Sequence, residues 1–436
     1  MKQPKTITAS EAVRLVKDND NIVSAMAAAE ARLFFGALHE RAHELKDISV
    51  TNCLPFFDAP YFIDEAYKDT FFVDSWFYGP SLRKATEHGN ISFIPNHLHL
   101  AGNKRLNYMK TDLFVGTATP PDKHGYVSLS LSNVYEKEAI LKAKTVILEI
   151  NPNFPRTLGD LELHISEVDY FIEADYMPPV LPDIEPNEKD VLIGNYIAER
   201  IDDGACLQLG IGGIPNAVAA ALVHKKDLGI HTEMFTTGLM KLVKAGAVTG
   251  KHKQSHHQKH VCCFALGTQE LYDFIDNNPS VEILNGNYVN DPHVISLNDN
   301  QVSINTTIEI DLTGQCASES IGHKQFSGTG GQADTAIGAQ KSKQGKSFIT
   351  LYSTTNARNP ETNERAVISK IVPTLKPGAA VTLSRNDVDY VVTEYGCVSL
   401  RGTSIKERVE LLISIAHPDF RDDLKKQAIA LGYIGA

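Results

Sequence analysis

The sequence predicts an α/β protein of two similar domains with largely parallel sheets. Three observations lead to this fold class. The chain of 436 residues is too long for one compact core. Short β-rich runs alternate with helical patterns along it. A segment with four prolines, Met177–Asp190, predicts an extended linker between two halves. We expect domains at residues 1–180 and 187–436, with a ligand-binding cleft between them.

In the first half, Thr8 and Glu11 have the spacing of a capping box and predict the start of a helix. A longer helix is expected from Ala27 to Leu45. The predicted strands of this half are Ile22–Ser24, Ile48–Thr51, Phe71–Trp76, Ile91–Ile94, Leu113–Gly116, Thr145–Glu149 and Tyr170–Glu173.

In the second half, helices are expected at Asp190–Ile201 and Pro215–Val223. The predicted strands are Cys206–Leu209, Leu228–His231, His260–Leu266, Val281–Leu284, Ser303–Asp311, Phe348–Tyr352, Val381–Leu383 and Tyr390–Thr393. This alternation is typical of parallel sheets, which carry functional groups at the carboxyl ends of their strands.

The overall charge limits the class of partner. A net charge of −11 would repel nucleic acid and anionic membranes, so neither is expected. Residues 1–10 lack the apolar core of a signal peptide, and no run of about 18 apolar residues occurs. The six cysteines are sparse and form no CxxC pair. We therefore expect a protein of the reducing cytoplasm.

A glycine-rich turn follows the predicted strand Cys206–Leu209. Gly210, Gly212 and Gly213 allow close backbone approach, and Pro215 lies near the start of the next helix, where its missing N–H costs nothing. Backbone N–H groups here could face an anion or a developing oxyanion. A tight turn without a ligand is the alternative.

A dinucleotide site is an alternative for this turn. Glu233 follows Gly210 at about the spacing of the acid in a Rossmann fingerprint. The third glycine of that fingerprint would fall at Pro215, however, so NAD is not the favoured ligand.

Glu233 lies between the strand Leu228–His231 and a helix expected to start near Thr236. Most glutamates are solvated surface groups. This one stands where parallel sheets place functional groups, beside the strand that ends in the glycine turn. A carboxylate nucleophile with amide donors for its oxyanion would suit acyl transfer.

Two further stretches contain candidate site residues. Gly328, Gly330 and Gly331 lie within four residues, which is more than a turn requires, although a flexible loop is the alternative. Glu394 ends another predicted strand beside a glycine, and Arg401 could bind a phosphate or a carboxylate. Either charge could instead belong to a surface ion pair.

The tract Lys251–Cys263 contains four histidines and two cysteines, which raises the question of zinc. Adjacent Cys262 and Cys263 would point to opposite faces of a strand, so at most one could join the histidines. The lysines of the tract would oppose a cation, and a metal needs convergent ligands. We expect an exposed basic loop leading into a buried strand, with no metal.

Several stretches together identify a family. They are PPDKHGY (120–126), GIGGIPNAV (210–218), GIHTEMF (229–235), NDP (290–292), INTTIEIDLTGQ (304–315), SGTGGQAD (327–334), residues 392–402 and ISIAHPDFR (413–421). Through them, nearly the whole chain resembles the acetyl-CoA hydrolase/transferase family of class I CoA-transferases, which includes 4-hydroxybutyrate and butyrate:acetate CoA-transferases.

The resemblance implies two α/β domains with the active site between them. It places the family's glutamate nucleophile on Glu233, an oxyanion donor on the Ile214 amide, and polar residues near the nucleophile. The implied site residues are Gly210, Ile211, Gly212, Gly213, Ile214, Glu233, Asn290, Gly330, Gly331 and Glu394. The chain departs from the family at Thr335, Ile337 and Thr237, which puts the shape of the acyl pocket in question.

The implied reaction moves CoA between a short-chain acyl-CoA (acetyl-, butyryl- or 4-hydroxybutyryl-CoA) and a carboxylate such as acetate, through a glutamyl-CoA thioester. CoA would be a substrate, and no separate cofactor or metal would be needed. Acyl-CoA hydrolysis and non-catalytic CoA binding on the same fold are the alternatives. A homodimer is the expected assembly.

Overall fold

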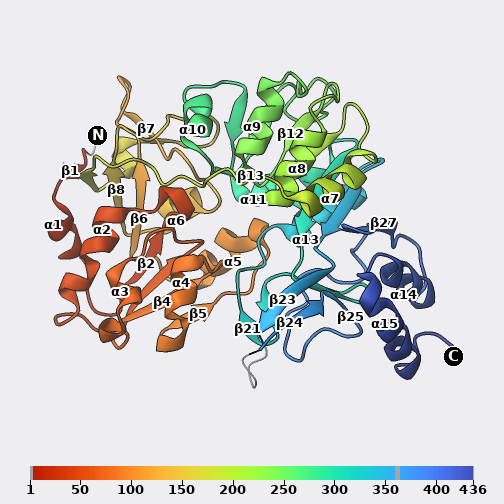
Figure 1. Ribbon diagram of the computed structural model, residues 1–436. Helices are drawn as coiled ribbons and strands as arrows, with labels where there is room; N and C mark the ends of the chain where they lie inside the picture. The colour runs from red at the N-terminus through yellow and green to blue at the C-terminus, as the bar shows by residue number, and fades with distance from the viewer. Residues whose placement is uncertain (1–2, 359–363, 436) are drawn as a thin grey trace.

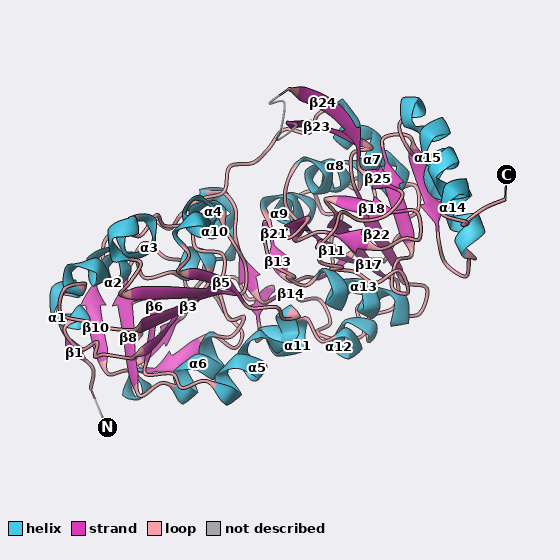
Figure 2. Cartoon of the chain, turned by 90° about the horizontal axis from the view of Figure 1, so that it is seen from below, coloured by secondary structure: helices cyan, strands magenta, loops and turns pink. Residues whose placement is uncertain are grey.

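The computed structural model describes residues 3–358 and 364–435. Two eight-stranded sheets organise the chain. Figure 1 shows them side by side, the N-terminal half in red to yellow and the C-terminal half in green to blue. Helices lie on both faces of each sheet (Figure 2). The predicted α/β fold class with largely parallel sheets is therefore confirmed.

The first sheet has the strand order β1-β10-β8-β6-β2-β3-β4-β5, and each of its pairings is parallel. Its central strand β6 is buried along its whole length, as expected for a strand covered on both faces. The strands are β1 (Lys5–Thr6), β2 (Asn21–Ser24), β3 (Ile48–Asn52), β4 (Phe71–Ser75), β5 (Ile91–Phe93), β6 (Leu113–Ala118), β8 (Thr145–Ile150) and β10 (Tyr170–Glu173).

Short helices and one antiparallel strand pair complete the first half. They are α1 (Ala9–Val13), η1 (Ala27–Ala29), α2 (Arg32–Ala37), η2 (Leu38–Arg41), α3 (Pro60–Ile63), η3 (Glu65–Tyr67), α4 (Pro80–Ala85), η4 (Thr86–His88), η5 (Leu98–Leu100), α5 (Ala101–Tyr108), β7 (Tyr126–Ser128), α6 (Glu136–Lys142), β9 (Glu162–His164) and η6 (Ile165–Glu167). The capping box at Thr8 is present.

The single helix predicted from Ala27 to Leu45 is wrong. The backbone is extended at Glu30 and Ala31, so the segment is divided into η1, α2 and η2. The buried Glu30 carboxylate accepts the N–H groups of Phe56 and Phe57, each at 3.2 Å. This tertiary contact overrides the helical pattern of the local sequence.

The second sheet has the order β16-β14-β12-β11-β17-β22-β26-β27, and only the β26–β27 pair at its edge is antiparallel. Its strands are β11 (Cys206–Leu209), β12 (Gly229–His231), β14 (His260–Cys262), β16 (Val281–Ile283), β17 (Gln301–Thr306), β22 (Lys346–Thr350), β26 (Tyr390–Thr393) and β27 (Gly396–Ser399). Its helices are α7 (Glu188–Ala198), α8 (Gly213–Ala221), α9 (Thr237–Lys244), α10 (Gln269–Ile275), α11 (Gly286–Val289), α12 (Pro292–Ser296), α13 (Gln332–Lys341), α14 (Ile405–Ser414) and α15 (Pro418–Ala430).

Small sheets flank this half and account for two corrections. They contain β13 (Met234–Phe235) with β15 (Phe264–Ala265), β18 (Glu309–Asp311) with β19 (Cys316–Ala317) and β25 (Ile371–Val372), β20 (Ser320–Ile321) with β21 (Lys324–Gln325), and β23 (Thr354–Arg358) with β24 (Arg365–Ser369). The predicted strands His260–Leu266 and Ser303–Asp311 are thus each divided in two. Val381–Leu383 is not a strand, since Leu383 makes only one isolated bridge.

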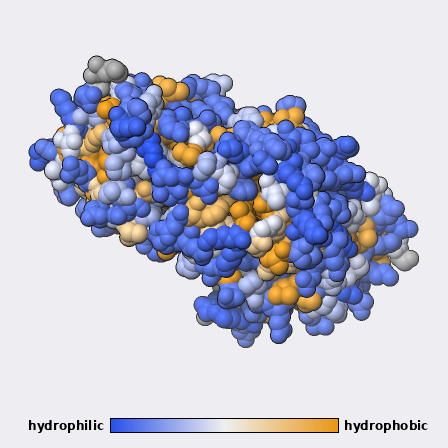
Figure 3. Space-filling model, turned by 90° about the horizontal axis from the view of Figure 1, so that it is seen from above, coloured by the Kyte–Doolittle hydropathy of each residue, from blue (hydrophilic) through white to orange (hydrophobic). Residues whose placement is uncertain are grey.

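The described residues 174–187 form neither helix nor strand, and α7 begins inside the expected linker. The two halves nevertheless pack closely. One hydrophobic core runs through both, and backbone bonds cross between them, from Asn133 N to Cys263 O and from Ala265 N to Leu131 O, both at 2.9 Å. Hydrophobic residues gather where the halves meet (Figure 3). The domain boundaries stay predictions.

Candidate active site

Glu233 lies between strands β12 and β13, which follow one another in the chain and pair with different partners. Strand β12 pairs with β14 before it, and β13 pairs with β15 after it. At this point, the N–H groups of Cys263 and Phe264 both donate to the Glu233 carbonyl, at 3.0 and 3.2 Å. The glycine turn follows β11, the parallel neighbour of β12. The predicted position of Glu233 beside that turn is therefore confirmed.

The Glu233 carboxylate meets polar groups from two other elements. Asn290, almost fully buried at the end of α11, donates its Nδ2 to Glu233 Oε2 at 2.9 Å. Gly331, the N-cap of α13, lies against the same oxygen: a Cβ at this position would stand only 1.8 Å from Oε2. Glycine is thus required for the close approach of carboxylate and backbone.

Burial raises the pKa of Glu233 from its ordinary 4.5 to about 7. The Asn290 amide opposes this rise, the charge of Asp334 adds to it, and the Gly331 amide opposes it. Near neutral pH the group therefore exists both as a carboxylate and as an acid. The carboxylate is partly desolvated and close to amide donors, which suits a nucleophile.

The Glu233 side chain opens into a cavity of about 260 Å³ that both halves line. The N-terminal half contributes apolar side chains, while the C-terminal half contributes both glycine clusters and polar groups on β17. The lining residues that carry the argument are Met26, Leu54, Phe77, Leu98, Gly210, Ile211, Asn305, Gly330 and Gly331. The expected location of the site between the halves agrees with this cavity.

A larger cavity of about 690 Å³ adjoins the first. The two share five lining residues, which are Ile211, Pro215, Thr306, Ser318 and Ser327. The larger cavity is also lined by Lys370, Lys376 and residues of β23 and β24. Burial lowers the pKa of Lys370. Lys376 Nζ lies 3.7 Å from Oε2 of the buried Glu309, which also lines this cavity, so the positive charge of Lys376 is partly offset.

The glycine turn separates the two cavities. Gly212, Gly213 and Ile214 line the larger one, Gly210 lines the smaller one, and Ile211 lines both. Gly212 is the N-cap of α8 with φ +108°, a conformation that favours glycine, and it has no side chain to cap the helix. The Asp190 carboxylate packs against the next residue, Gly213, where an added Cβ would lie 2.2 Å from Asp190 Oδ2. The first N–H groups of α8 therefore stand next to the larger cavity.

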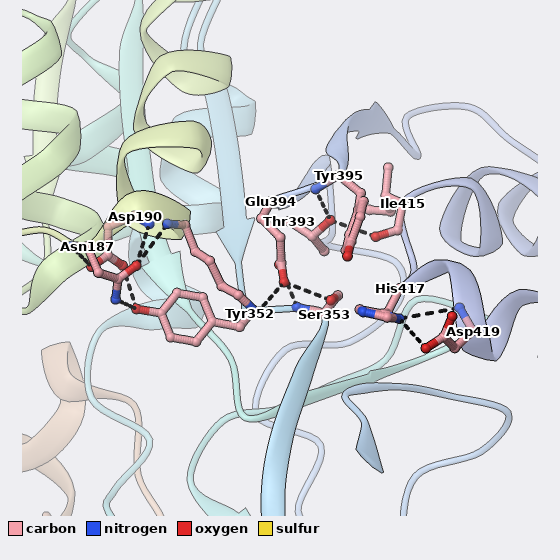
Figure 4. Close-up of polar contacts among 11 residues, drawn as sticks. Asn187, Asp190, Tyr352, Ser353, Thr393, Glu394, Tyr395, Ile415, His417 and Asp419 are labelled. Carbon is pink, nitrogen blue, oxygen red and sulfur yellow. Dashed lines mark hydrogen bonds and ion pairs between the residues drawn. The ribbon is translucent and has the colours of Figure 1, made fainter. Parts of the chain in front are cut away.

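Glu394 and Arg401 do not join this group. In Figure 4, Glu394 points toward Ser353, whose N–H and Oγ donate to it at 2.8 and 2.9 Å. Lys189 Nζ is also 2.9 Å away. Burial favours a higher pKa for Glu394, but Lys189 and Ser353 outweigh it and the net pKa is lowered. Arg401 donates to buried Asp389 at 2.6 Å. Among the described residues, the linings of both cavities omit Glu394 and Arg401.

The His/Cys tract forms turns that lead into the buried strand β14, as expected, but Lys253 in the loop is buried rather than exposed. His256 contacts Glu282 at 2.6 Å and Tyr288 at 3.0 Å. In the part of the chain that the structure describes, no group of three or more His, Cys, Asp or Glu side chains is arranged to hold a metal ion. That the protein holds no metal stays a prediction.

Sequence reasoning missed the contribution of the N-terminal half. Phe77 and Leu98 reach the cavity only because the halves dock, and no local motif marks them. It also missed a link between His99 and Asp334, whose side chains are 2.8 Å apart. The one signal in the sequence was that Asp334 ends the glycine-rich stretch 327–334.

Of the departures from the family pattern, Thr335 lies beside the cavity of Glu233. Thr335 is buried on α13, and its Oγ1 accepts from Asn305 Nδ2 at 3.0 Å. Asn305 itself lines the cavity of Glu233. Thr237 Oγ1 instead accepts the N–H of Thr268 at 3.1 Å, at the start of α9. Thr335 thus bears on the shape of the site, whereas Thr237 holds α9 against α10.

Known proteins resemble this chain over almost its full length. A Geobacter metallireducens succinyl-CoA:cyclohexane-1-carboxylate CoA transferase is 47% identical over 97% of this chain and 95% of its own. A Clostridium kluyveri 4-hydroxybutyrate coenzyme A transferase is 42% identical over 97% of each chain.

Solved structures agree. RipA from Yersinia pestis has a TM-score of 0.92 at 34% identity, covering 99% of this chain and 98% of its own. A 4-hydroxybutyrate CoA-transferase from Porphyromonas gingivalis has a TM-score of 0.80 at 36% identity, covering 98% of each. Residues 2–182 match the acetyl-CoA hydrolase/transferase N-terminal domain, and residues 267–428 match the C-terminal domain. The chain belongs to the acetyl-CoA hydrolase/transferase family.

Proposed function

We propose that this protein transfers CoA between a short-chain acyl-CoA and a carboxylate acceptor such as acetate, with Glu233 as the nucleophile. The observation that carries the proposal is the Glu233 carboxylate, packed against the Gly331 backbone and hydrogen-bonded to Asn290 at the edge of a cavity. The named relatives, several of which are CoA transferases, support the same reaction.

The reaction proceeds through two covalent states of Glu233. Its carboxylate attacks the thioester carbonyl, and the C–S bond breaks to give a mixed anhydride and CoA thiolate. The thiolate then attacks the glutamyl carbonyl, which releases the carboxylic acid as its anion and leaves a glutamyl-CoA thioester. A second carboxylate enters and the steps reverse. Each bond broken is replaced by one of similar kind, so the exchange stays near thermoneutral.

Backbone amides stabilise the charge that develops on each tetrahedral carbonyl oxygen. The Gly331 amide lies next to the Glu233 carboxylate. The Ile214 amide belongs to the first turn of α8, whose start separates the two cavities. We assign these two amides as the oxyanion donors, with Asn290 orienting the carboxylate.

The larger cavity suits the nucleotide end of CoA. Its Lys370 provides a cation for phosphate groups, and Lys376, whose Nζ lies 3.7 Å from Glu309 Oε2, provides a second. The residues shared with the smaller cavity would let a pantetheine arm pass to Glu233. Binding of this distant part of CoA can help form the high-energy anhydride.

The decisive experiment is mass spectrometry of the enzyme incubated with butyryl-CoA in the absence of an acceptor acid. The protein should gain the mass of CoA less one water, on the peptide that contains Glu233. Glu233→Gln should lose the adduct because an amide is a poor nucleophile. Glu233→Asp should react on the order of 10²-fold more slowly, since the attacking oxygen is displaced by about 1 Å. Glu394→Gln should still form the adduct.

Other outcomes separate the alternatives. An adduct on Glu394 would reverse the two roles, and exchange without any adduct would indicate a ternary complex. Acyl-CoA turnover that does not depend on acetate would indicate a hydrolase. Binding of CoA without turnover would indicate a non-catalytic protein.

Two broader expectations belong to the same proposal. A homodimer in the cytoplasm remains the expected state, and the six cysteines, all free thiols, are compatible with a reducing compartment. Among the described residues, no helix is long and apolar enough to cross a membrane. Light scattering on the purified protein tests the dimer, and fractionation of its native cells tests the location.

A further inference from the structure

One side chain of the second half is held twice by one residue of the first. Asp334, on the first turn of α13, is almost completely buried. Its Oδ1 is 2.8 Å from His99 Nδ1, and its Oδ2 accepts the His99 backbone N–H at 3.1 Å. Next to this pair, the Leu98 N–H donates to Gly330 O at 3.2 Å. The η5 turn is therefore fastened to the start of α13.

The start of α13 also carries the backbone that faces the nucleophile. Gly331 caps the helix three residues before Asp334, and its backbone lies against the Glu233 carboxylate. A shift of α13 would therefore move the amide nearest to the reacting carboxylate. The bond to His99 opposes such a shift, because it ties this end of the helix to the other half.

The same pair sets the charge that Glu233 experiences. The Asp334 carboxylate helps to raise the pKa of Glu233. For His99, burial lowers the pKa, but the Asp334 hydrogen bond and charge outweigh it and the net pKa is raised. A protonated His99 therefore offsets the charge of Asp334.

Other titratable groups also face His99 and Glu233. Around His99, Asp291 favours the protonated ring and Lys104 opposes it, while His97 stacks on the ring and lies 3.8 Å from Asp334. Near Glu233, burial raises the pKa of the Cys53 and Cys263 thiols well above the ordinary value, so both are neutral.

We propose that His99 and Asp334 are positioning residues for the transfer reaction: together they clamp α13 against the N-terminal half and tune the charge opposite Glu233. This proposal rests on the proposed function of Glu233. Neither residue touches the Glu233 carboxylate through a hydrogen bond in the described part of the chain. Both act through the Gly331 backbone and through charge.

The test is the rate of adduct formation at Glu233, followed by mass spectrometry from pH 5 to pH 9. The acid limb is the part of the profile where the rate falls as the pH is lowered. Asp334→Asn keeps the shape of the side chain and removes its charge, so the acid limb should move to lower pH by about one unit. His99→Ala leaves Asp334 charged and unpaired, so the acid limb should move up. The rate on its plateau should also fall, by about tenfold or more, as the clamp is lost.

Two further variants act as controls. His99→Asn restores a donor near the Nδ1 position without the charge, so it should recover most of the plateau rate while the acid limb stays shifted upward. His97→Ala should shift the limb less than His99→Ala, because His97 makes no close hydrogen bond to Asp334. If the two residues had a purely structural role, both Asp334→Asn and His99→Ala would reduce the rate at every pH, and the acid limb would not move in opposite directions in the two variants.

The outcomes of this experiment are separable. If wild-type enzyme forms no adduct on Glu233, the proposed function fails. If the wild-type adduct forms and the acid limbs of Asp334→Asn and His99→Ala coincide with the wild-type limb, the positioning proposal is wrong. If Asp334→Asn does not fold, the comparison of His99→Ala with His99→Asn decides alone, since equal plateau rates in the two would exclude the clamp.

Discussion

At the scale of single residues, the protonation of Glu233 limits the reaction. Only the carboxylate attacks a thioester, and burial raises the pKa of this group to about 7. As pH falls below that value the carboxylate fraction declines, so kcat/KM should drop about tenfold for each pH unit on the acid side. A pH profile of kcat/KM with a stable acyl-CoA measures this. An acid limb near the ordinary 4.5 would contradict the expected burial of the free carboxylate.

Gly331 matters because its backbone lies close to the Glu233 carboxylate. A single added methyl would meet Glu233 Oε2 and Asn290 Nδ2, at 1.8 and 2.3 Å. Gly331→Ala should therefore slow adduct formation by on the order of 10²-fold or more, and Gly331→Val should abolish it. The backbone φ of −99° is open to any residue, so the fold should persist. Gly36→Ala is the matched control, since its Cβ would meet only Phe57 at an ordinary 3.7 Å. Full activity of Gly331→Val would contradict the position of the Gly331 backbone against the reacting carboxylate.

At the scale of elements, local pattern predicted the strands better than their interruptions. Cys206–Leu209 and Tyr390–Thr393 occur as predicted, because each is a short apolar run between turn residues. The break between β14 and β15 could not be predicted, since there the N–H groups of Cys263 and Phe264 both donate to one carbonyl of the neighbouring segment, that of Glu233. The bend at Glu30 depends in the same way on a loop more than twenty residues later.

The His/Cys tract contains a buried lysine that the sequence pattern did not predict. Its Lys253 is buried and donates to the carbonyls of Ile230 and Lys259, at 2.7 and 2.8 Å. A buried cation in the middle of the tract opposes binding of another cation. Elemental analysis of purified protein should find no stoichiometric zinc, and activity should survive treatment with a chelator. One tightly held metal per chain would overturn this prediction.

At the scale of the whole molecule, the site exists only because the two halves dock. Sequence motifs located Glu233, Asn290 and both glycine clusters, which all belong to the C-terminal half. The apolar wall opposite them comes from the N-terminal half, whose residues have no shared motif. A wall assembled from distant segments leaves no periodic signal in the sequence, so its composition had to come from the structure.

This division predicts that acyl preference and CoA affinity can be changed separately. Phe77 lines the cavity of Glu233 and stands beside Gly330, whose Cβ would be 3.5 Å from its ring. Phe77→Ala should enlarge the acyl side and raise kcat/KM for hexanoyl-CoA relative to butyryl-CoA by about tenfold, the effect of a methylene or two in an apolar pocket.

Of the two cavities, Lys370 lines the larger one. Lys370→Met should raise KM for both acyl-CoAs by the same factor, since it removes a charge from the proposed nucleotide site. Steady-state kinetics with the two substrates measures both effects. If Phe77→Ala weakens CoA binding while leaving the hexanoyl to butyryl ratio unchanged, the acyl group lies elsewhere, and the N-terminal half binds CoA instead.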